Sequence, residues 1–237
     1  VLAQVPPTRS GGDVMRLRTF LRPVLHRVLP PVVKYYLRKP RRYRYHGLEL
    51  MIQPGVFHPG MYISTRYFLE HIRGLDLAGK KVLELGAGSG LISLWCARAG
   101  AEVTASDISS LAVRNVKDGA RRNGLTLQVV QSDLFEELPL VTFDFIFINP
   151  PYYPGTPTDE EAHAWYCGPE FEYFDRLFQG LGDFVGPGSK VLMVLSEDCQ
   201  LERISGAGEP HHWYMEKFHQ EKRRGEWNYI FELTNHE

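Results

Sequence analysis

The segment from residue 81 to residue 99 constrains the fold of this chain more than any other. An apolar, strand-like run at 81–85 leads directly into three glycines at alternate positions, Gly86, Gly88 and Gly90, and an apolar helical run follows at 91–99. Glycine lets the backbone turn tightly and lets a ligand approach it closely. A glycine loop between a strand and a helix is typical of nucleotide-type binding sites in parallel α/β sheets.

Strand-like and helical segments continue to alternate after this loop. We expect strands at 102–106, 126–131, 143–148 and 190–195, with helices at 109–123 and 171–181. This alternation predicts a parallel sheet with helices on both faces. Two further strand-like runs, joined by a polar stretch at 219–226, predict a terminal hairpin. The expected fold class is therefore α/β, with a seven-stranded, mostly parallel sheet and a C-terminal antiparallel hairpin.

The N-terminal part of the chain differs in charge from the rest. Residues 1–46 hold 11 of the 27 Lys/Arg residues but only one of the 28 Asp/Glu residues. We expect a basic arm at 1–46, partly disordered or helical, with a charged linker at 39–44, and a single domain at 47–237. Such an arm could contact RNA, DNA or an anionic surface, or pack its apolar residues on the domain.

Several site types and locations are not expected. No apolar run reaches the roughly 20 residues that span a bilayer, and no secretory signal pattern is visible. Cys96, Cys167 and Cys199 are widely spaced and form no CxxC pair, and the histidines lack partners at metal-ligand spacing. We therefore expect no metal site and no disulfide framework, and a cytoplasmic location.

Acidic residues at the ends of the predicted strands indicate one cofactor. Asp107 can accept hydrogen bonds from ribose hydroxyls. Asp133 can accept from an adenine amino group, with Ile108 and Leu134 flanking the ring. Glu84 can meet the ammonium of an amino-acid moiety. The spacing is GxGxG, without the GxGxxG of dinucleotide enzymes or a P-loop lysine. These features predict S-adenosyl-L-methionine, which has no pyrophosphate.

A second motif, Asn-Pro-Pro-Tyr at 149–152, follows the continuous apolar strand expected at 143–148. The side-chain oxygen of Asn149 and the carbonyl of Pro150 can accept the two N–H groups of a planar NH2. Pro151 helps to fix the backbone, and Tyr152 offers a ring for stacking. Two such acceptors would favour an sp3-like nitrogen with its lone pair aimed at a methyl group. The motif therefore predicts N-methylation, driven by positioning and electrostatics.

Together the motifs resemble class I S-adenosylmethionine-dependent methyltransferases that carry an (N/D)PP(Y/F/W) motif, over about residues 56–233. Within this class the chain is most similar to release-factor glutamine N5-methyltransferases and their archaeal and eukaryotic relatives. The resemblance implies a Rossmann-like fold. It also implies that the segment 56–65 closes over the cofactor, with contacts from Phe57 and Thr65, and that the segment 164–169 shapes the substrate entrance.

The expected site and the open alternatives follow from these arguments. The expected catalytic residues are Asn149, Pro150, Pro151 and Tyr152. The expected cofactor-binding residues are Phe57, Thr65, Glu84, Gly86, Ala87, Gly88, Gly90, Asp107, Ile108, Asp133, Leu134 and Asn149. A protein glutamine is the first expected acceptor. An RNA or DNA nucleobase, at adenine N6 or guanine N2, is the alternative, because those enzymes share the clamp motif. A catalytically idle nucleic-acid-binding module is a third class and would need a blocked cofactor pocket.

Overall fold

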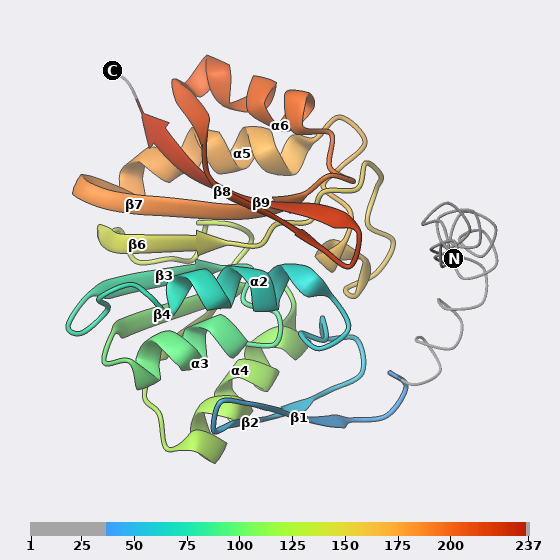
Figure 1. Ribbon diagram of the computed structural model, residues 1–237, viewed down its shortest axis with the longest axis vertical. Helices are drawn as coiled ribbons and strands as arrows, with labels where there is room; N and C mark the ends of the chain where they lie inside the picture. The colour runs from blue at the N-terminus through green and yellow to red at the C-terminus, as the bar shows by residue number, and fades with distance from the viewer. Residues whose placement is uncertain (1–36, 236–237) are drawn as a thin grey trace, which may run out of the picture. The chain divides into compact units, whose positions relative to one another are not determined.

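The computed structural model describes residues 37–235, and its compact unit begins at Pro40 (Figure 1). Most of the basic arm predicted at 1–46 lies outside the described residues, so its disorder, its helical content and its contacts with RNA, DNA or an anionic surface stay predictions. No helix within 37–235 is long and apolar enough to cross a membrane. The cytoplasmic location is likewise still a prediction.

A seven-stranded sheet forms the centre of the unit, in the order β5-β4-β3-β6-β7-β9-β8. Its strands are β3 (Lys81–Leu85), β4 (Glu102–Asp107), β5 (Gln128–Gln131), β6 (Phe143–Ile148), β7 (Val185–Ser196), β8 (Trp213–Arg223) and β9 (Glu226–Asn235). The first five strands in this order pair in parallel, and β9 pairs antiparallel with both β7 and β8. This arrangement confirms the predicted fold class, including the C-terminal hairpin.

Helices cover both faces of the sheet, as Figure 1 shows. They are α2 (Ile63–Ile72), α3 (Leu91–Arg98), α4 (Ser110–Asn123), α5 (Glu172–Leu181) and α6 (Leu201–Gly208), with short 3-10 turns η1 (Ala162–Ala164), η2 (Gly182–Phe184) and η3 (Glu209–His211). Alternate side chains of β7 pack into the two hydrophobic cores, one on each face of the sheet. Leu192 and Val194 lie in the core under α2 and α3, whereas Met193 lies in the core under α5 and α6. The central strands are apolar on both faces because both faces are covered.

The charged linker predicted at 39–44 is wrong, because β1 (Arg41–Tyr45) pairs antiparallel with β2 (Leu48–Ile52). Basic and aromatic residues alternate along β1. Tyr43 and Tyr45 lie on the side that packs on the core, while Arg42 and Arg44 point away from it. This period of two is a strand pattern, and the high charge of the segment obscured it.

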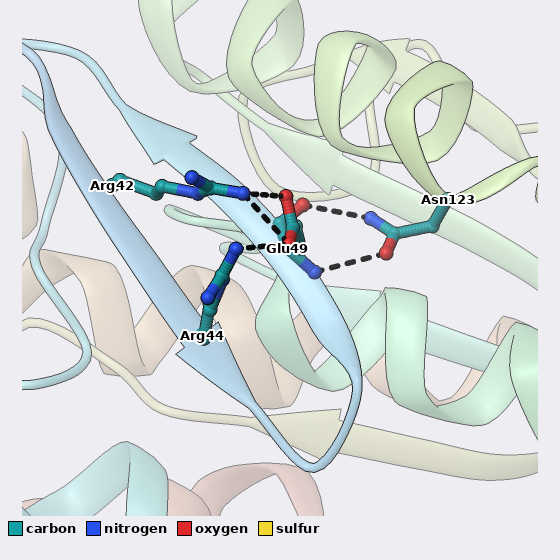
Figure 2. A network of polar contacts seen from close by, with 4 residues as sticks. All are labelled: Arg42, Arg44, Glu49 and Asn123. Carbon is teal, nitrogen blue, oxygen red and sulfur yellow. Dashed lines mark hydrogen bonds and ion pairs between the residues drawn. The ribbon is translucent and has the colours of Figure 1, made fainter.

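The side chain of Asn123, the last residue of α4, joins this hairpin to the rest of the unit (Figure 2). Its amide oxygen accepts from the backbone N–H of Glu49 over 2.9 Å, and its amide nitrogen donates to the Glu49 carbonyl over 2.8 Å. The Glu49 carboxylate pairs with Arg42 and Arg44 over 2.6 and 2.9 Å. These exposed ion pairs lie within the hairpin and add little stability, whereas the hydrogen bonds of Asn123 link the hairpin to α4.

Two further differences lie near the C-terminus. The polar connection predicted at 219–226 is wrong, because β8 and β9 extend through it to a tight turn at Arg224 and Gly225. Both turn residues have positive φ, 51° and 91°. Helix α6 was not predicted, since its sequence is rich in glycine and only Ile204 among its apolar residues is fully buried.

Candidate active site

A cavity of about 440 Å³ opens at the carboxyl ends of the parallel strands. Ligands of open α/β sheets bind at this edge. The cavity is lined by every sequence-predicted site residue except one: Phe57, Thr65, Glu84, Gly86, Ala87, Gly88, Asp107, Ile108, Asp133, Leu134, Asn149, Pro150, Pro151 and Tyr152. The two motifs, far apart in the chain, therefore meet in one site.

Gly90 is the predicted residue that does not line the cavity. It is the N-cap of α3 and has φ of 79°. A Cβ atom at this position would lie 2.8 Å from Cγ2 of Val116. Its glycine is therefore explained by the left-handed turn into α3 and by close packing against α4, rather than by a ligand.

The carboxylate of Asp107 is tied to the glycine loop. Its Oδ2 accepts from the backbone N–H of Gly88 over 2.8 Å, and its Oδ1 accepts from that of Ser109 over 2.9 Å. Burial nevertheless raises the pKa of Asp107 above its usual value. Each oxygen keeps acceptor capacity for a further donor. The geometry thus fits the predicted pair of ribose hydroxyls.

Glu84 is a buried carboxyl group at the base of the cavity, only 4% exposed. Its Oε2 accepts from the backbone N–H of Ser93 over 2.7 Å and from the Ser93 hydroxyl. Burial raises the pKa of Glu84 to about 8. No basic side chain among the described residues forms an ion pair with it. A cationic group entering the cavity would stabilise its ionised form, so Glu84 fits an ammonium ligand.

Asp133 is held by a partner that the sequence did not indicate. Its Oδ2 lies 2.9 Å from Nη2 of Arg176 on α5, which also contacts Glu136. The neighbouring residue Leu134 has φ of 51°, a left-handed conformation unusual for leucine. The hydroxyl of Ser132 donates to the Leu134 carbonyl over 2.9 Å. These contacts fix both the carboxylate and the apolar side chain proposed to face adenine.

The amide of Asn149 is oriented by Thr65. Its Nδ2 donates to the Thr65 hydroxyl over 3.3 Å. Thr65 belongs to the first turn of α2 and is 5% exposed. With the nitrogen so engaged, the amide oxygen is the end available to accept from a ligand. The clamp motif requires an acceptor at this position.

Tyr152 follows the clamp and is enclosed by polar and aromatic neighbours. Its ring centroid lies 4.7 Å from that of Tyr153. Burial raises the pKa of Tyr152 far above the usual value, and the hydroxyl lies beside those of Tyr153 and Ser196. The phenol therefore stays neutral, which suits stacking better than proton abstraction.

Three aromatic side chains, Phe57, Tyr62 and Trp165, pack together on one wall of the cavity. Phe57 stacks on Tyr62 at 4.5 Å, and Trp165 lies 4.8 Å from Tyr62 and 5.3 Å from Phe57, measured between ring centroids. We call these residues the aromatic cluster. The sequence indicated Tyr62 and Trp165 only by their places in the segments 56–65 and 164–169.

The loop after the clamp closes another side of the cavity. The backbone N–H of Tyr153 donates to the Trp165 carbonyl over 2.9 Å. Further along, the Glu160 carboxylate accepts from the Ser109 hydroxyl over 3.0 Å and from the backbone N–H of Leu111 over 3.2 Å. Glu160 therefore meets the first turn of α4, where a negative charge is favourable. This contact joins the clamp loop to the strand end that carries Asp107.

Asn115 joins two other walls of the cavity and is 1% exposed. Its Oδ1 accepts from the backbone N–H of Gln53 over 3.1 Å, and its Nδ2 donates to the Ser89 carbonyl over 3.0 Å. It thereby links the segment that leads to Phe57 with the glycine loop. A single asparagine in a helix gives no sequence signal for this role.

Comparison with known proteins identifies the family of this chain. Residues 47–165, half of the chain, match the family model for the methyltransferase small domain. The chain is 34% identical over 158 residues to a putative protein N5-glutamine methyltransferase of Methanocaldococcus jannaschii, covering 63% of this chain and 77% of that one. It is 35% identical over 156 residues to the ribosomal RNA small subunit methyltransferase C of Chromohalobacter salexigens, covering 65% of this chain but only 43% of that relative.

Solved structures share the fold. The 16S rRNA N2 G1207 methyltransferase of T. thermophilus, in complex with AdoMet and guanosine, aligns with a TM-score of 0.60 at 23% identity. The alignment covers 82% of this chain and 50% of that one. The Mtq2-Trm112 complex of E. cuniculi aligns with a TM-score of 0.56 at 21% identity, covering 77% of this chain and 99% of that one.

Proposed function

This chain belongs to the methyltransferase small domain family, and from that premise we propose that it methylates the side-chain amide nitrogen of glutamine in a protein. It is an S-adenosyl-L-methionine-dependent methyltransferase. Bound in the cavity, the cofactor would supply an electrophilic methyl group on a sulfonium. Glu84, Asp107 and Asp133 are the carboxylates that would hold its ammonium, ribose and adenine amino groups.

The observation that carries the proposal is the orientation of Asn149. Its nitrogen is engaged by Thr65 and the residue lines the cavity, so its oxygen is the end that would accept a hydrogen bond from the substrate. The Pro150 carbonyl supplies the second acceptor, since proline adds no N–H to compete. A planar NH2 group would donate one N–H to each of these two acceptors, and the amide of glutamine carries such a group.

The clamp requires no strong base. The cofactor would supply the methyl group on a positively charged sulfonium, so the accepting nitrogen would need no prior deprotonation and could release its proton to water afterwards. Burial raises the pKa of Tyr152, which keeps this neighbour from acting as a base. The residues around the nitrogen therefore act by positioning and by accepting hydrogen bonds, which is where catalysis of this kind gains most.

Two observations support glutamine as the acceptor. The relative of which this chain covers the larger share is described as a putative protein N5-glutamine methyltransferase. Carboxylates other than those assigned to the cofactor also line the cavity, among them Glu172, Asp198 and Glu226. Such charges oppose a phosphate backbone more than a polypeptide.

A nucleobase is the second candidate. The ring of Tyr153 is 38% exposed beside Tyr152, and this pair could stack on a base. The ribosomal RNA relative also supports it. The idle nucleic-acid-binding module is disfavoured by the open cavity of about 440 Å³, in which the cofactor-type residues converge.

The test is transfer of tritiated methyl groups from S-adenosyl-L-methionine into fractionated cell extract. Aliquots are then treated with protease or nuclease, and the labelled residue is identified by mass spectrometry. We expect protease-sensitive, nuclease-resistant label in N5-methylglutamine, and label lowered about 100-fold or more with the Asn149→Ala variant. Nuclease-sensitive label would support the nucleobase instead. Label that survives both treatments would indicate a small-molecule acceptor and contradict the proposal.

A further inference from the structure

A second cavity, of about 120 Å³, adjoins the active site. It is lined by Gly60, Tyr62, Ile63, Arg66, Arg223 and Arg224. Tyr62 and Ile63 line both cavities. We call this second space the arginine cavity. Three guanidinium groups around one small space beside a catalytic clamp need an explanation, because like charges repel when no anion lies between them.

Two of the three arginines are available to a ligand. Arg66 is exposed on the first turn of α2, and Arg224 is exposed at the turn between β8 and β9. Within residues 37–235, neither forms an ion pair. The first turn of α2 also contains no acidic residue, and the N-terminus of the helix adds its own positive partial charge there. The Glu70 carboxylate, which also holds the third arginine, lies close enough to Arg66 for the two charges to interact.

Arg223 forms the fixed wall of the arginine cavity. Its guanidinium contacts the carboxylates of Glu70 at 2.6 Å and Glu221 at 2.7 Å, and its central carbon lies 5.1 Å from the ring centroid of Tyr67. Those two carboxylates neutralise it, so the free positive charge comes from Arg66 and Arg224. The buried Nε of Arg223 has no hydrogen-bond partner.

The chemistry of the cavity defines its ligand as an oxyanion. Guanidinium groups bind carboxylates and phosphates through paired N–H groups, with a geometry that lysine lacks. A nucleic acid would bring a phosphate at every nucleotide. Those phosphates would also meet Asp198 and Glu226 in the adjoining active site. A polypeptide can instead place one carboxylate in the arginine cavity and none near the acidic groups.

We infer that Arg66 and Arg224 bind the side-chain carboxylate of an aspartate or glutamate in the acceptor protein. This inference rests on the proposed protein acceptor. The first turn of α2 connects the two contacts, since Thr65 orients Asn149 and the next residue, Arg66, lines the arginine cavity. The acceptor is then recognised at two points, its glutamine amide at the clamp and its carboxylate at the arginines.

The test compares the wild type with Arg66→Gln, Arg224→Gln and the double variant, using the protease-sensitive acceptor fraction described above. Arg122→Gln, on the exposed end of α4, is the matched control. We expect each single variant to raise the half-saturating fraction concentration about fivefold, since each removes a charge-assisted hydrogen bond. The maximal rate and the cofactor affinity should stay within twofold. Added salt should weaken the wild type more than the double variant.

A second arm identifies the anion. The carboxylates of the acceptor fraction are blocked with carbodiimide and ethanolamine. The wild type should then need as high a half-saturating concentration of this blocked fraction as the double variant needs of untreated fraction. Unchanged half-saturation in the arginine variants would overturn the inference and leave glutamine methylation standing. If blocking the carboxylates leaves the half-saturating concentration of the wild type unchanged, the ligand of the arginines is not a carboxylate and the inference fails. Nuclease-sensitive label that depends on both arginines would show a phosphate ligand, and both proposals would then fail.

Discussion

The side-chain nitrogen of Asn149 donates a hydrogen bond to the hydroxyl oxygen of Thr65, although the two residues are 84 positions apart in the chain. Asn149 directly follows β6, and Thr65 lies on α2, which packs on the sheet from one face. The clamp motif supplies an amide at this point, but the amide has a donor end and an acceptor end. In the structure the donor end meets Thr65 of α2, which leaves the acceptor end for the substrate.

Removing the Thr65 hydroxyl should therefore impair the clamp without removing it. Thr65→Val keeps the side-chain shape and leaves the Asn149 nitrogen without its acceptor. We expect single-turnover methyl transfer to slow by about three- to tenfold, corresponding to one neutral hydrogen bond. Cofactor affinity, measured by calorimetry, should change by less. Thr65→Ser should recover most of the rate, and a Thr65→Ser variant as slow as Thr65→Val would contradict this role.

Replacing Asn149 itself should have a larger effect on rate than on binding. Asn149→Ala removes one of the two acceptors for the substrate NH2 group. We expect turnover to fall by about 100-fold or more, the size found when a single oriented transition-state hydrogen bond is lost. The cofactor dissociation constant should stay within about threefold by isothermal titration calorimetry. Comparable losses in turnover and in cofactor affinity would instead assign Asn149 to the cofactor.

The sequence predicted those parts of the fold that depend on local pattern. The run Phe143–Ile148 is apolar throughout, because its strand is covered on both faces. The ends of such strands were predictable because the apolar run stops there. Parallel strands bring their carboxyl ends to one edge of the sheet. This geometry alone places Glu84, Asp107 and Asp133 around one cavity. The common direction of the parallel strands was enough to predict that these three carboxylates lie together.

The remaining parts depend on contacts that no local pattern records. Asn115 lies on an amphipathic helix where a polar side chain suggests solvent, yet it is buried between Gln53 and Ser89. The sequence gives Arg176 no signal beyond its place in a predicted helix, because its partner Asp133 lies far upstream. The polar residues at 219–223 continue β8, since pairing with β9 rather than burial stabilises them.

The raised pKa of Glu84 makes the stability of the free protein depend on pH. Its folded pKa, about 8, lies above the ordinary value of 4.5. Between these values the folded state keeps a proton that the unfolded state has lost, so the free energy of unfolding falls as pH rises through this window. Glu84→Gln cannot ionise, and we expect a flatter profile of urea denaturation midpoint from about pH 5 to 8. A variant profile as steep as that of the wild type would contradict this origin.

Ligand binding should reverse the protonation of Glu84. An ammonium beside the carboxylate favours the ionised form, so S-adenosyl-L-methionine should release a proton when it binds near pH 7. The calorimetric enthalpy of binding should then differ between phosphate and Tris buffers, because the two buffers take up that proton with different heats. Glu84→Gln should bind more weakly and lose this buffer dependence. A buffer dependence that persists in the variant would assign the proton to another group.

The aromatic cluster should control how fast the cofactor leaves. Trp165 contacts both Phe57 and Tyr62, and all three line the cavity. Trp165→Ala removes one of the three rings, and we expect cofactor dissociation, followed by stopped-flow displacement, to accelerate about tenfold, the effect of losing roughly 1.4 kcal/mol of packing. Trp165→Phe should preserve most of the slow release. Equal acceleration in both variants would mean that the indole N–H, rather than the ring packing, matters.

Two asparagines of α4 provide a matched pair for separating stability from site geometry. Asn123 holds the backbone of Glu49, and Asn115 holds Gln53 and the glycine loop at Ser89. Each replacement by alanine leaves backbone N–H and C=O groups without their hydrogen-bond partners. We therefore expect each to lower the free energy of unfolding by about 1–3 kcal/mol in urea denaturation. Only Asn115→Ala should also weaken cofactor binding, by about fivefold or more, because only Asn115 joins two walls of the cavity. Equal weakening by Asn123→Ala would show that the whole hairpin, and not the Asn115 bridge, sets the position of the segment leading to Phe57.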